Sequence, residues 1–243
     1  MMSKDGSRRL SAVSDIVTLL DRPLYAIPSV DRLLALTPGT ARRWIDGYMR
    51  SGRMYPPVIR IESTGDEVVT WGEFVEARLL SEYRAAGVPL ARMRPAIEKL
   101  RETFNTMYPL ARSHPFVAGR ELVLKAQESV RLDHGLLLVV IRNDQLVLTD
   151  RANSFVSSAD FTGDEGIVER LRPVSRIAEV VIDPLRQFGE PVVRSVRTEI
   201  IAEQVRAGES IDAIVESYEL SRSQVEAAIQ YELVRESPDT IAA

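Results

Sequence analysis

Regularly spaced apolar residues near the N-terminus predict two short helices. Val30, Leu33 and Leu34 recur at i, i+3 and i+4, the spacing of one helix face. Ser29 precedes them as a candidate N-cap. The second helix is predicted to open at Thr37-Pro38, where a cap is followed by proline at the first helical position. Its apolar stripe consists of Ala41, Trp44, Ile45 and Tyr48. Two short helices joined by a tight turn are typical of a helix-turn-helix motif.

Apolar and polar residues alternate weakly after these helices, and this pattern predicts a β-hairpin. Residues 58–61 and 67–70 flank a turn-like segment at 63–66. A hairpin placed directly after a helix-turn-helix would be a wing.

Two further helices are expected after this hairpin. Thr70 and Glu73 fit a capping box, and the helix that they open is predicted to stop at Gly87. Another helix is predicted over residues 90–104, where Pro95 indicates a kink or a later start.

From Phe116 onward, the spacing of the apolar residues changes from a helical to a strand pattern. Strands are predicted at residues 121–126, 137–142, 145–149 and 180–182, with Asn143-Asp144 as a hairpin turn. Helical patterns return near the C-terminus, first over residues 198–206 and then in two helices capped by Ser210 and by the Ser221–Gln224 capping box.

These elements predict an α+β fold that is mainly helical. We expect an N-terminal tail with a short helix at 1–23, a winged-helix domain at 24–112, a small β-rich middle at 113–178 and a three-helix, helix-turn-helix-like domain at 179–243.

The amino-acid composition excludes several classes of protein. The 243 residues are 45% hydrophobic, which is ordinary for a globular protein, and they include no cysteine, so disulfides and thiolate chemistry are excluded. The longest apolar run, residues 136–141, is far shorter than the roughly 20 residues of a membrane span. We therefore expect a cytoplasmic protein without membrane contact.

Motifs for catalysis are missing. The chain has no glycine-rich phosphate loop, and its two histidines have no second metal ligand at helical spacing. No carboxylate spacing singles out a catalytic pair. We expect no enzymatic activity, no metal site and no cofactor.

Charge divides the chain into a basic front and an acidic back. Residues 1–60 hold 10 Lys and Arg against 5 Asp and Glu, which gives +5, whereas residues 183–243 hold 6 against 12, which gives −6. Basic side chains on a helix and a wing suit contacts with DNA phosphates and groove edges. The predicted DNA-binding residues are Arg42, Arg43, Arg50, Arg53, Tyr55 and Arg60.

Residues 24–104 resemble the MerR-like winged-helix DNA-binding domain. The resemblance rests on Tyr25-Ala26-Ile27-Pro28-Ser29-Val30, Arg42-Arg43-Trp44-Ile45, Tyr55-Pro56-Pro57 and Ala86-Gly87-Val88-Pro89-Leu90. It implies that the second helix enters the major groove and that the wing grips the backbone, with contacts from Arg42, Arg43, Arg53 and Tyr55.

Residues 179–234 resemble the short helical domain of VapB-like antitoxins, which are encoded beside PIN-domain ribonuclease toxins. The matching run is Ile182-Asp183-Pro184, Gly189-Glu190-Pro191-Val192-Val193, Arg197-Thr198, Ala207-Gly208-Glu209-Ser210, Tyr218-Glu219-Leu220-Ser221 and Gln224-Val225-Glu226-Ala227-Ala228. The resemblance implies a toxin whose carboxylates hold Mg²⁺ or Mn²⁺, and Arg194 and Arg197 are candidate contacts with such a site.

The expected function is that of a type II antitoxin. It would neutralise a PIN-domain toxin encoded by the neighbouring gene and, as a homodimer on double-stranded operator DNA, repress its own operon. The alternative is a free-standing MerR-like regulator in which residues 113–182 sense a ligand.

Overall fold

The computed structural model describes residues 19–164 and 166–236 of the chain. The described residues form two compact units, unit 1 up to Val168 and unit 2 from Glu169 onward. The tail and short helix predicted at 1–23 lie mostly outside the described residues.

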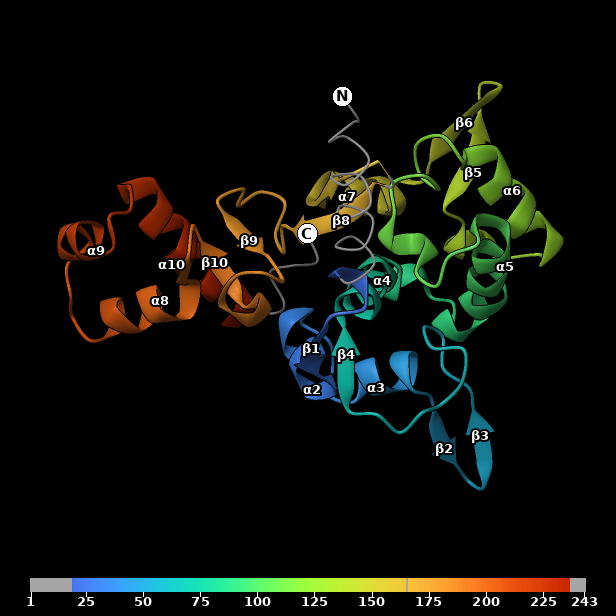
Figure 1. Cartoon of the computed structure of the whole chain (residues 1–243), viewed down its shortest axis with the longest axis horizontal. Helices are drawn as coiled ribbons and strands as arrows, with labels where there is room; N and C mark the ends of the chain where they lie inside the picture. Colours follow the sequence, from blue (N-terminus) through green and yellow to red (C-terminus); the bar gives the residue numbers. More distant parts are fainter. Residues whose placement is uncertain (1–18, 165, 237–243) are drawn as a thin grey trace, which may run out of the picture. The chain divides into compact units, whose positions relative to one another are not determined.

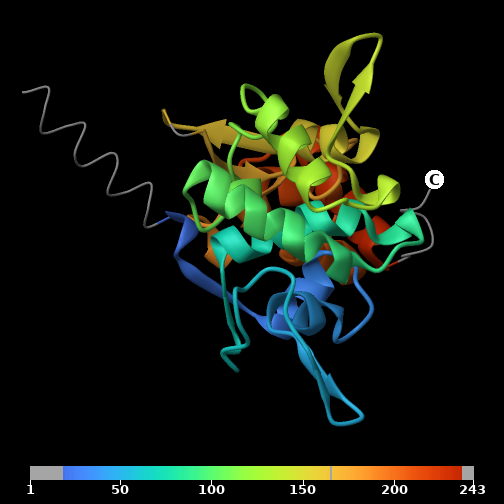
Figure 2. The same ribbon diagram turned by 90° about the vertical axis from the view of Figure 1, so that its right-hand side faces the viewer.

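Unit 1 opens with small elements around a helix-turn-helix. They are β1 (Pro23–Ala26), α2 (Ile27–Leu33), α3 (Thr40–Ile45), β2 (Tyr48–Arg50), β3 (Arg53–Tyr55) and β4 (Val68–Thr70). β1 pairs with β4 and β2 pairs with β3, both antiparallel. Figures 1 and 2 show the β2–β3 hairpin projecting away from the other elements of unit 1.

The two predicted helices exist with different ends. α2 begins at Ile27 rather than after Ser29, and α3 begins at Thr40 rather than at Pro38. α3 also stops before Tyr48, because Gly47 turns the chain with a φ of +76° and Tyr48 starts a strand.

The predicted hairpin of residues 58–61 with 67–70 is wrong. The N–H groups of Val58 and Ile59 both donate to the carbonyl of Trp44, at 2.7 and 2.9 Å, so this segment closes the end of α3. Residues 68–70 pair instead with β1. The hairpin that follows the helix-turn-helix is β2–β3.

The helices that follow β4 in sequence agree better with prediction. The order is α4 (Trp71–Glu82), η1 (Arg84–Ala86), η2 (Leu90–Met93), α5 (Arg94–Phe104) and η3 (Pro109–Ala111). The Thr70–Glu73 capping box is present, and Gly87 ends the segment with a φ of +72°. Pro95 lies in the first turn of α5, which confirms the late start.

The rest of unit 1 mixes helices and strands. It contains α6 (Arg120–Ser129), η4 (His134–Leu136), β5 (Val139–Arg142), β6 (Gln145–Leu148), α7 (Asp150–Ser158) and β7 (Ala159–Thr162), and it ends within β8 (Ile167–Leu171). The strand predicted at 121–126 is wrong, because Val123, Ala126 and Gln127 form the buried face of α6 at i, i+3 and i+4. The β5–β6 hairpin turns at Asn143-Asp144 as predicted.

Unit 2 places three helices against a small antiparallel sheet. Its elements after β8 are β9 (Val180–Ile182), η5 (Gln187–Gly189), β10 (Pro191–Val193), β11 (Val196–Arg197), α8 (Thr198–Arg206), α9 (Ile211–Tyr218) and α10 (Arg222–Glu236). α10 packs on α8 and β10. Ser210 caps α9, and Ser221 and Gln224 form the predicted box. Val180, Val193, Ile201 and Val225 lie in its core.

Candidate nucleic-acid interface

A buried carboxylate sets the turn of the helix-turn-helix. Asp31, on α2, is 7% exposed and accepts hydrogen bonds from Gly39 N and Ala41 N, both at 2.7 Å. These N–H groups belong to the start of α3, whose first donors lack partners inside the helix. A side chain ten residues upstream therefore caps α3 and fixes its position relative to α2.

α3 buries one side and presents arginines on the other. Ala41 and Trp44 are buried, as the apolar stripe predicted, so Trp44 belongs to the core. Arg43 is exposed and donates to Thr40 Oγ1 at 2.8 Å. Arg42 is half-buried and forms an ion pair with Glu67, which helps to raise the pKa of Arg42.

The β2–β3 hairpin follows α3 after two residues. A Cβ on Gly47 would meet Tyr55 O at 2.5 Å, so only glycine fits where the hairpin leaves α3. Ser51 and Gly52 form the two-residue turn with φ values of +51° and +75°, the signs of a type I′ turn. This turn sets Arg50 opposite Arg53.

The two faces of the hairpin differ in chemistry. Tyr48 and Tyr55 stack with ring centroids 4.8 Å apart, and the Arg53 guanidinium lies 5.5 Å from the centroid of Tyr55. The cross-strand pair Met49 and Met54 alternates with them and is 64% and 43% exposed. The hairpin therefore combines a cationic tip with one aromatic and one apolar face.

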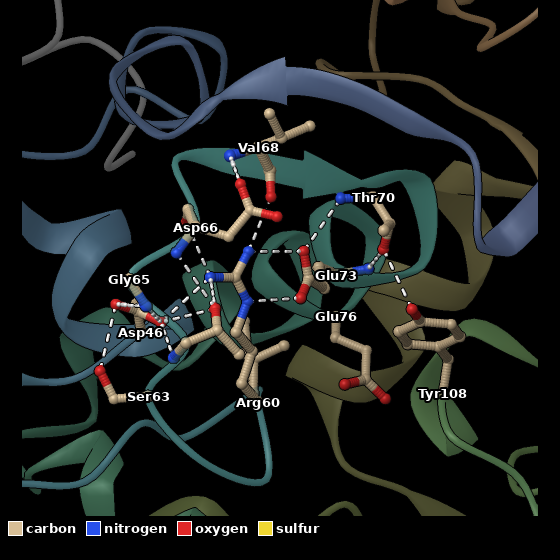
Figure 3. Close-up of polar contacts among 12 residues, drawn as sticks. Asp46, Arg60, Ser63, Gly65, Asp66, Val68, Thr70, Glu73, Glu76 and Tyr108 are labelled. Carbon is tan, nitrogen blue, oxygen red and sulfur yellow. Dashed lines mark hydrogen bonds and ion pairs between the residues drawn. The ribbon is translucent and has the colours of Figure 1, made fainter.

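Arg60, the last predicted DNA contact, is placed differently from the others. Figure 3 shows its guanidinium surrounded by acceptors, and its side chain is only 8% exposed. It donates to Glu73 Oε1 at 2.7 Å, Asp46 Oδ1 at 3.0 Å and the carbonyl of Val68 at 2.7 Å. These contacts join the end of α3 to β4 and to the capping box of α4.

Asp46 completes the same cluster. Burial alone would raise its pKa, but hydrogen bonds from Thr64 N at 2.8 Å, from Arg60 and from Gly65 N outweigh burial and hold the pKa below its usual value. Asp46 is therefore ionised at neutral pH and anchors the loop at 63–65. The structure gives Arg60 an internal role in holding this loop.

The remaining predicted residues separate into two groups. Arg42, Arg43, Arg50, Arg53 and Tyr55 lie on consecutive elements of unit 1. Arg194 and Arg197 belong to unit 2, where Arg194 donates to the carbonyl of Glu219 at 2.9 Å and Arg197 precedes α8 as its N-cap residue.

Sequence reasoning does not find the apolar part of the hairpin. The helical stripe extends to Tyr48 and leaves Met49 and Met54 without an assigned face, so neither residue stands out from the pattern. The Ser51-Gly52 dipeptide is the signal that could reveal the hairpin, since Ser-Gly marks a tight turn.

A cavity of about 300 Å³ borders the Arg60 cluster. Ile61, Met107 and Tyr108 line it together with Arg60 and Arg101.

Within residues 19–164 and 166–236, no three His, Asp or Glu side chains gather in a way that could hold a metal ion. In the same described part, no helix has the length and apolar character required to cross a bilayer.

Two protein families match parts of the chain. Residues 23–97 match one described as "Putative DNA-binding HTH domain", and residues 180–231 match one described as "Protein of unknown function (DUF433)". The first match runs from β1 into the first turn of α5 and agrees with the helix-turn-helix described above.

Whole-length relatives come from Mycobacterium tuberculosis. Uncharacterized protein Rv2308 is 40% identical over 231 residues, which cover 91% of this chain and 95% of that protein. "Putative antitoxin VapB45" is 28% identical over 227 residues, which cover 86% and 93% of the two chains. The crystal structure of Rv2018 superposes with a TM-score of 0.70 at 26% identity, over 86% of this chain and 99% of that one.

Proposed function

This chain belongs to the family of the Mycobacterium tuberculosis protein Rv2308, and we propose that it is a DNA-binding antitoxin that represses its own operon. The observation that carries the proposal is the sequence of basic elements in unit 1. α3, the second helix of the helix-turn-helix, carries Arg42 and Arg43. Two residues later the β2–β3 hairpin begins, and Arg50 and Arg53 flank its turn. The similarity to a protein named as an antitoxin supports the antitoxin role.

DNA binding follows from the chemistry of these side chains. Guanidinium groups pair with phosphates and, in the major groove, with guanine edges. We infer that α3 enters the groove as in MerR-like winged helices, while Arg50, Arg53 and Tyr55 hold the backbone. Arg60 has no part in this contact, because acceptors inside unit 1 occupy its guanidinium.

Toxin binding is assigned to unit 2. The segment 180–231, which matches the family of unknown function, covers most of this unit. The resemblance of residues 179–234 to VapB-like antitoxins favours a PIN-domain ribonuclease as the partner. The helices of unit 2 are acidic, so DNA phosphates would be repelled from them. Binding alone would neutralise the toxin, and the proposal needs neither catalysis nor a cofactor.

The proposed repressor is a homodimer. One α3 and one hairpin cover a single half-site, whereas operators with two-fold symmetry need two. Light scattering at micromolar concentration is expected to give twice the 27.2 kDa of the chain. A mass of one chain would contradict the dimer.

Gel retardation on the region upstream of the gene tests the DNA half. Wild type should retard the fragment, and Arg43→Ala should bind about 1–3 kcal/mol more weakly if the side chain reads a base edge. Arg142→Ala is the control, because Arg142 is an exposed arginine on the β5–β6 hairpin of the same unit. Absence of retardation by wild type at low salt would refute DNA binding.

The alternative is a free-standing regulator with residues 113–182 as a sensor. Both functions predict operator binding, so only the partner separates them. Co-expression with the neighbouring gene should yield a co-purified complex and protect cells from the toxin. A regulator without a toxin would give neither result.

A further inference from the structure

The loop between β9 and β10 carries two of the exposed apolar side chains of unit 2. Phe188 is 81% exposed and Leu185 is 62% exposed. Both lie within a segment whose ends, Ile182 and Val192, are buried in the sheet. Exposure of a phenylalanine to this extent leaves its apolar surface in water, which is unfavourable.

Several hydrogen bonds and an ion pair hold the loop despite this exposure. Asp183 is buried and its carboxylate accepts from Leu185 N at 2.9 Å and pairs with Arg186 Nε at 3.2 Å. Arg186 Nη1 donates to the carbonyl of Arg194 at 3.0 Å, and Gln187 Nε2 donates to the carbonyl of Ser195 at 3.0 Å. The side chains next to Phe188 therefore tie the loop to the turn between β10 and β11.

The backbone at the tip is strained. Gln187 and Phe188 have φ values of +46° and +56°, a region that non-glycine residues rarely adopt. Gly189 follows with +73°. Consecutive left-handed residues persist only where the surroundings determine them, and such strain clusters at ligand-binding positions. The loop thus gives up some stability in presenting Phe188 outward.

Charge around the loop is opposite to that of the helices. Residues 183–197 contain Arg186, Arg194 and Arg197 against two acids, which gives +1. Residues 198–243 contain 3 arginines against 10 acids, which gives −7. Arg186 and Arg194 are exposed beside the apolar tip. The loop is therefore the part of unit 2 suited to an acidic surface.

We propose that Phe188, with Leu185, is the anchor by which unit 2 docks into an apolar pocket bordered by carboxylates on a protein partner. An aromatic side chain on a preorganised loop loses little conformational freedom on binding and is typical of interface hot spots. Arg186 and Arg194 would face the carboxylates of the rim. The inference rests on the proposed function in taking the neighbouring gene product as the partner.

Three variants of the full-length chain test the anchor against the purified neighbouring gene product. Phe188→Ala should raise the dissociation constant by about 30-fold or more, as removal of an aromatic hot spot does. Leu233→Ala is the control, because Leu233 is 60% exposed on α10 of the same unit, and it should bind like wild type. Phe188→Gly relieves the positive φ, so it should unfold at an equal or higher temperature while binding as weakly as Phe188→Ala.

The outcomes separate the anchor from the proposed function. If wild type binds and Phe188→Ala binds equally well, the anchor is refuted while the antitoxin function stands. If wild type does not bind the gene product, the proposed function fails, and the anchor as stated fails with it. If Phe188→Ala instead abolishes a dimer seen by light scattering, the occupant is a second copy of this chain and the proposal is wrong. Retained operator binding by each variant shows that unit 1 is folded.

Discussion

Arg60 and Glu73 form a bidentate ion pair inside unit 1, with Nε–Oε1 at 2.7 Å and Nη2–Oε2 at 3.3 Å. Both side chains are less than 10% exposed. Glu73 also accepts from Thr70 N at 2.9 Å, so the pair joins the segment after α3 to the start of α4. The position of the helix-turn-helix on its supporting helix depends on this pair.

Arg60→Ala and Arg43→Ala should therefore have different effects. Removing Arg60 leaves Asp46 and Glu73 buried without their counter-ion, which should cost about 3–5 kcal/mol of stability. Removing exposed Arg43 should change the free energy of unfolding by less than about 0.5 kcal/mol while weakening operator binding. Urea unfolding combined with DNA titration measures both. Equal stability of the two variants would show that the Arg60 cluster is unimportant.

Asp31→Ala should loosen α3. The variant lacks the acceptor of Gly39 N and Ala41 N, and removal of such a cap costs about 0.5–2 kcal/mol. Asp31→Asn retains one carbonyl acceptor and should lie between Asp31→Ala and wild type. Glu62→Ala changes an exposed carboxylate in the same unit and serves as control. Thermal unfolding gives the order, and an unchanged midpoint for Asp31→Ala would contradict the capping role.

The hairpin should contribute to the salt dependence of DNA binding. If Arg50 and Arg53 bind phosphates, a variant without one of these arginines should have a log–log salt slope that is smaller by about 0.9. Arg50→Ala and Arg53→Ala should each flatten the slope in this way, whereas Arg142→Ala should leave it unchanged. Fluorescence anisotropy over a range of salt concentrations provides the slopes. Identical slopes for all three variants would remove the hairpin from the interface.

Stability should fall as the pH rises from about 4.5 to about 7 because of Glu76. This side chain is fully buried, and burial raises its pKa to about 7 even though Arg101 and the Leu110 N–H, 3.2 Å away, favour the charged form. The folded pKa lies above the unfolded one, so the contribution is complete below about pH 4.5 and is lost as the pH rises through about 7. The decrease in stability is about 3 kcal/mol.

Glu76→Gln should flatten this part of the pH profile. The amide keeps an acceptor for Leu110 N and cannot ionise, so the variant should be more stable than wild type at pH 8. Glu232→Gln is the counterpart in unit 2, where burial also raises the pKa of the carboxyl. Chemical unfolding from pH 5 to 8 tests this, and a profile of Glu76→Gln parallel to that of wild type would contradict it.

Several local signals in the sequence predict the structure correctly, whereas the caps expected at Ser29 and Thr37 do not start α2 and α3. The Thr70–Glu73 and Ser221–Gln224 boxes and the start of α5 near Pro95 depend on residues within one helical turn. The short turn at Asn143-Asp144 likewise connects neighbours in sequence. Each of these predictions is confirmed because the interaction that decides it is encoded within a few residues.

Contacts between distant residues explain two of the failures. Tyr48 fits the helical stripe at i+7, but Gly47 and the pairing of Tyr48 with Tyr55 place it in a strand. Arg60 is a basic residue in a basic region, and only the folded chain brings it to Glu73, thirteen positions away. Long-range pairing therefore decides which arginines remain exposed.

We propose that one chain binds operator DNA through unit 1 and a toxin through unit 2. Gel retardation of the upstream fragment, with and without the purified neighbouring gene product, tests both halves in one measurement. We predict a band retarded by the protein alone and a further retarded band when the gene product is added. Free DNA in every lane at low salt, or a band that the gene product does not shift further, would contradict the account.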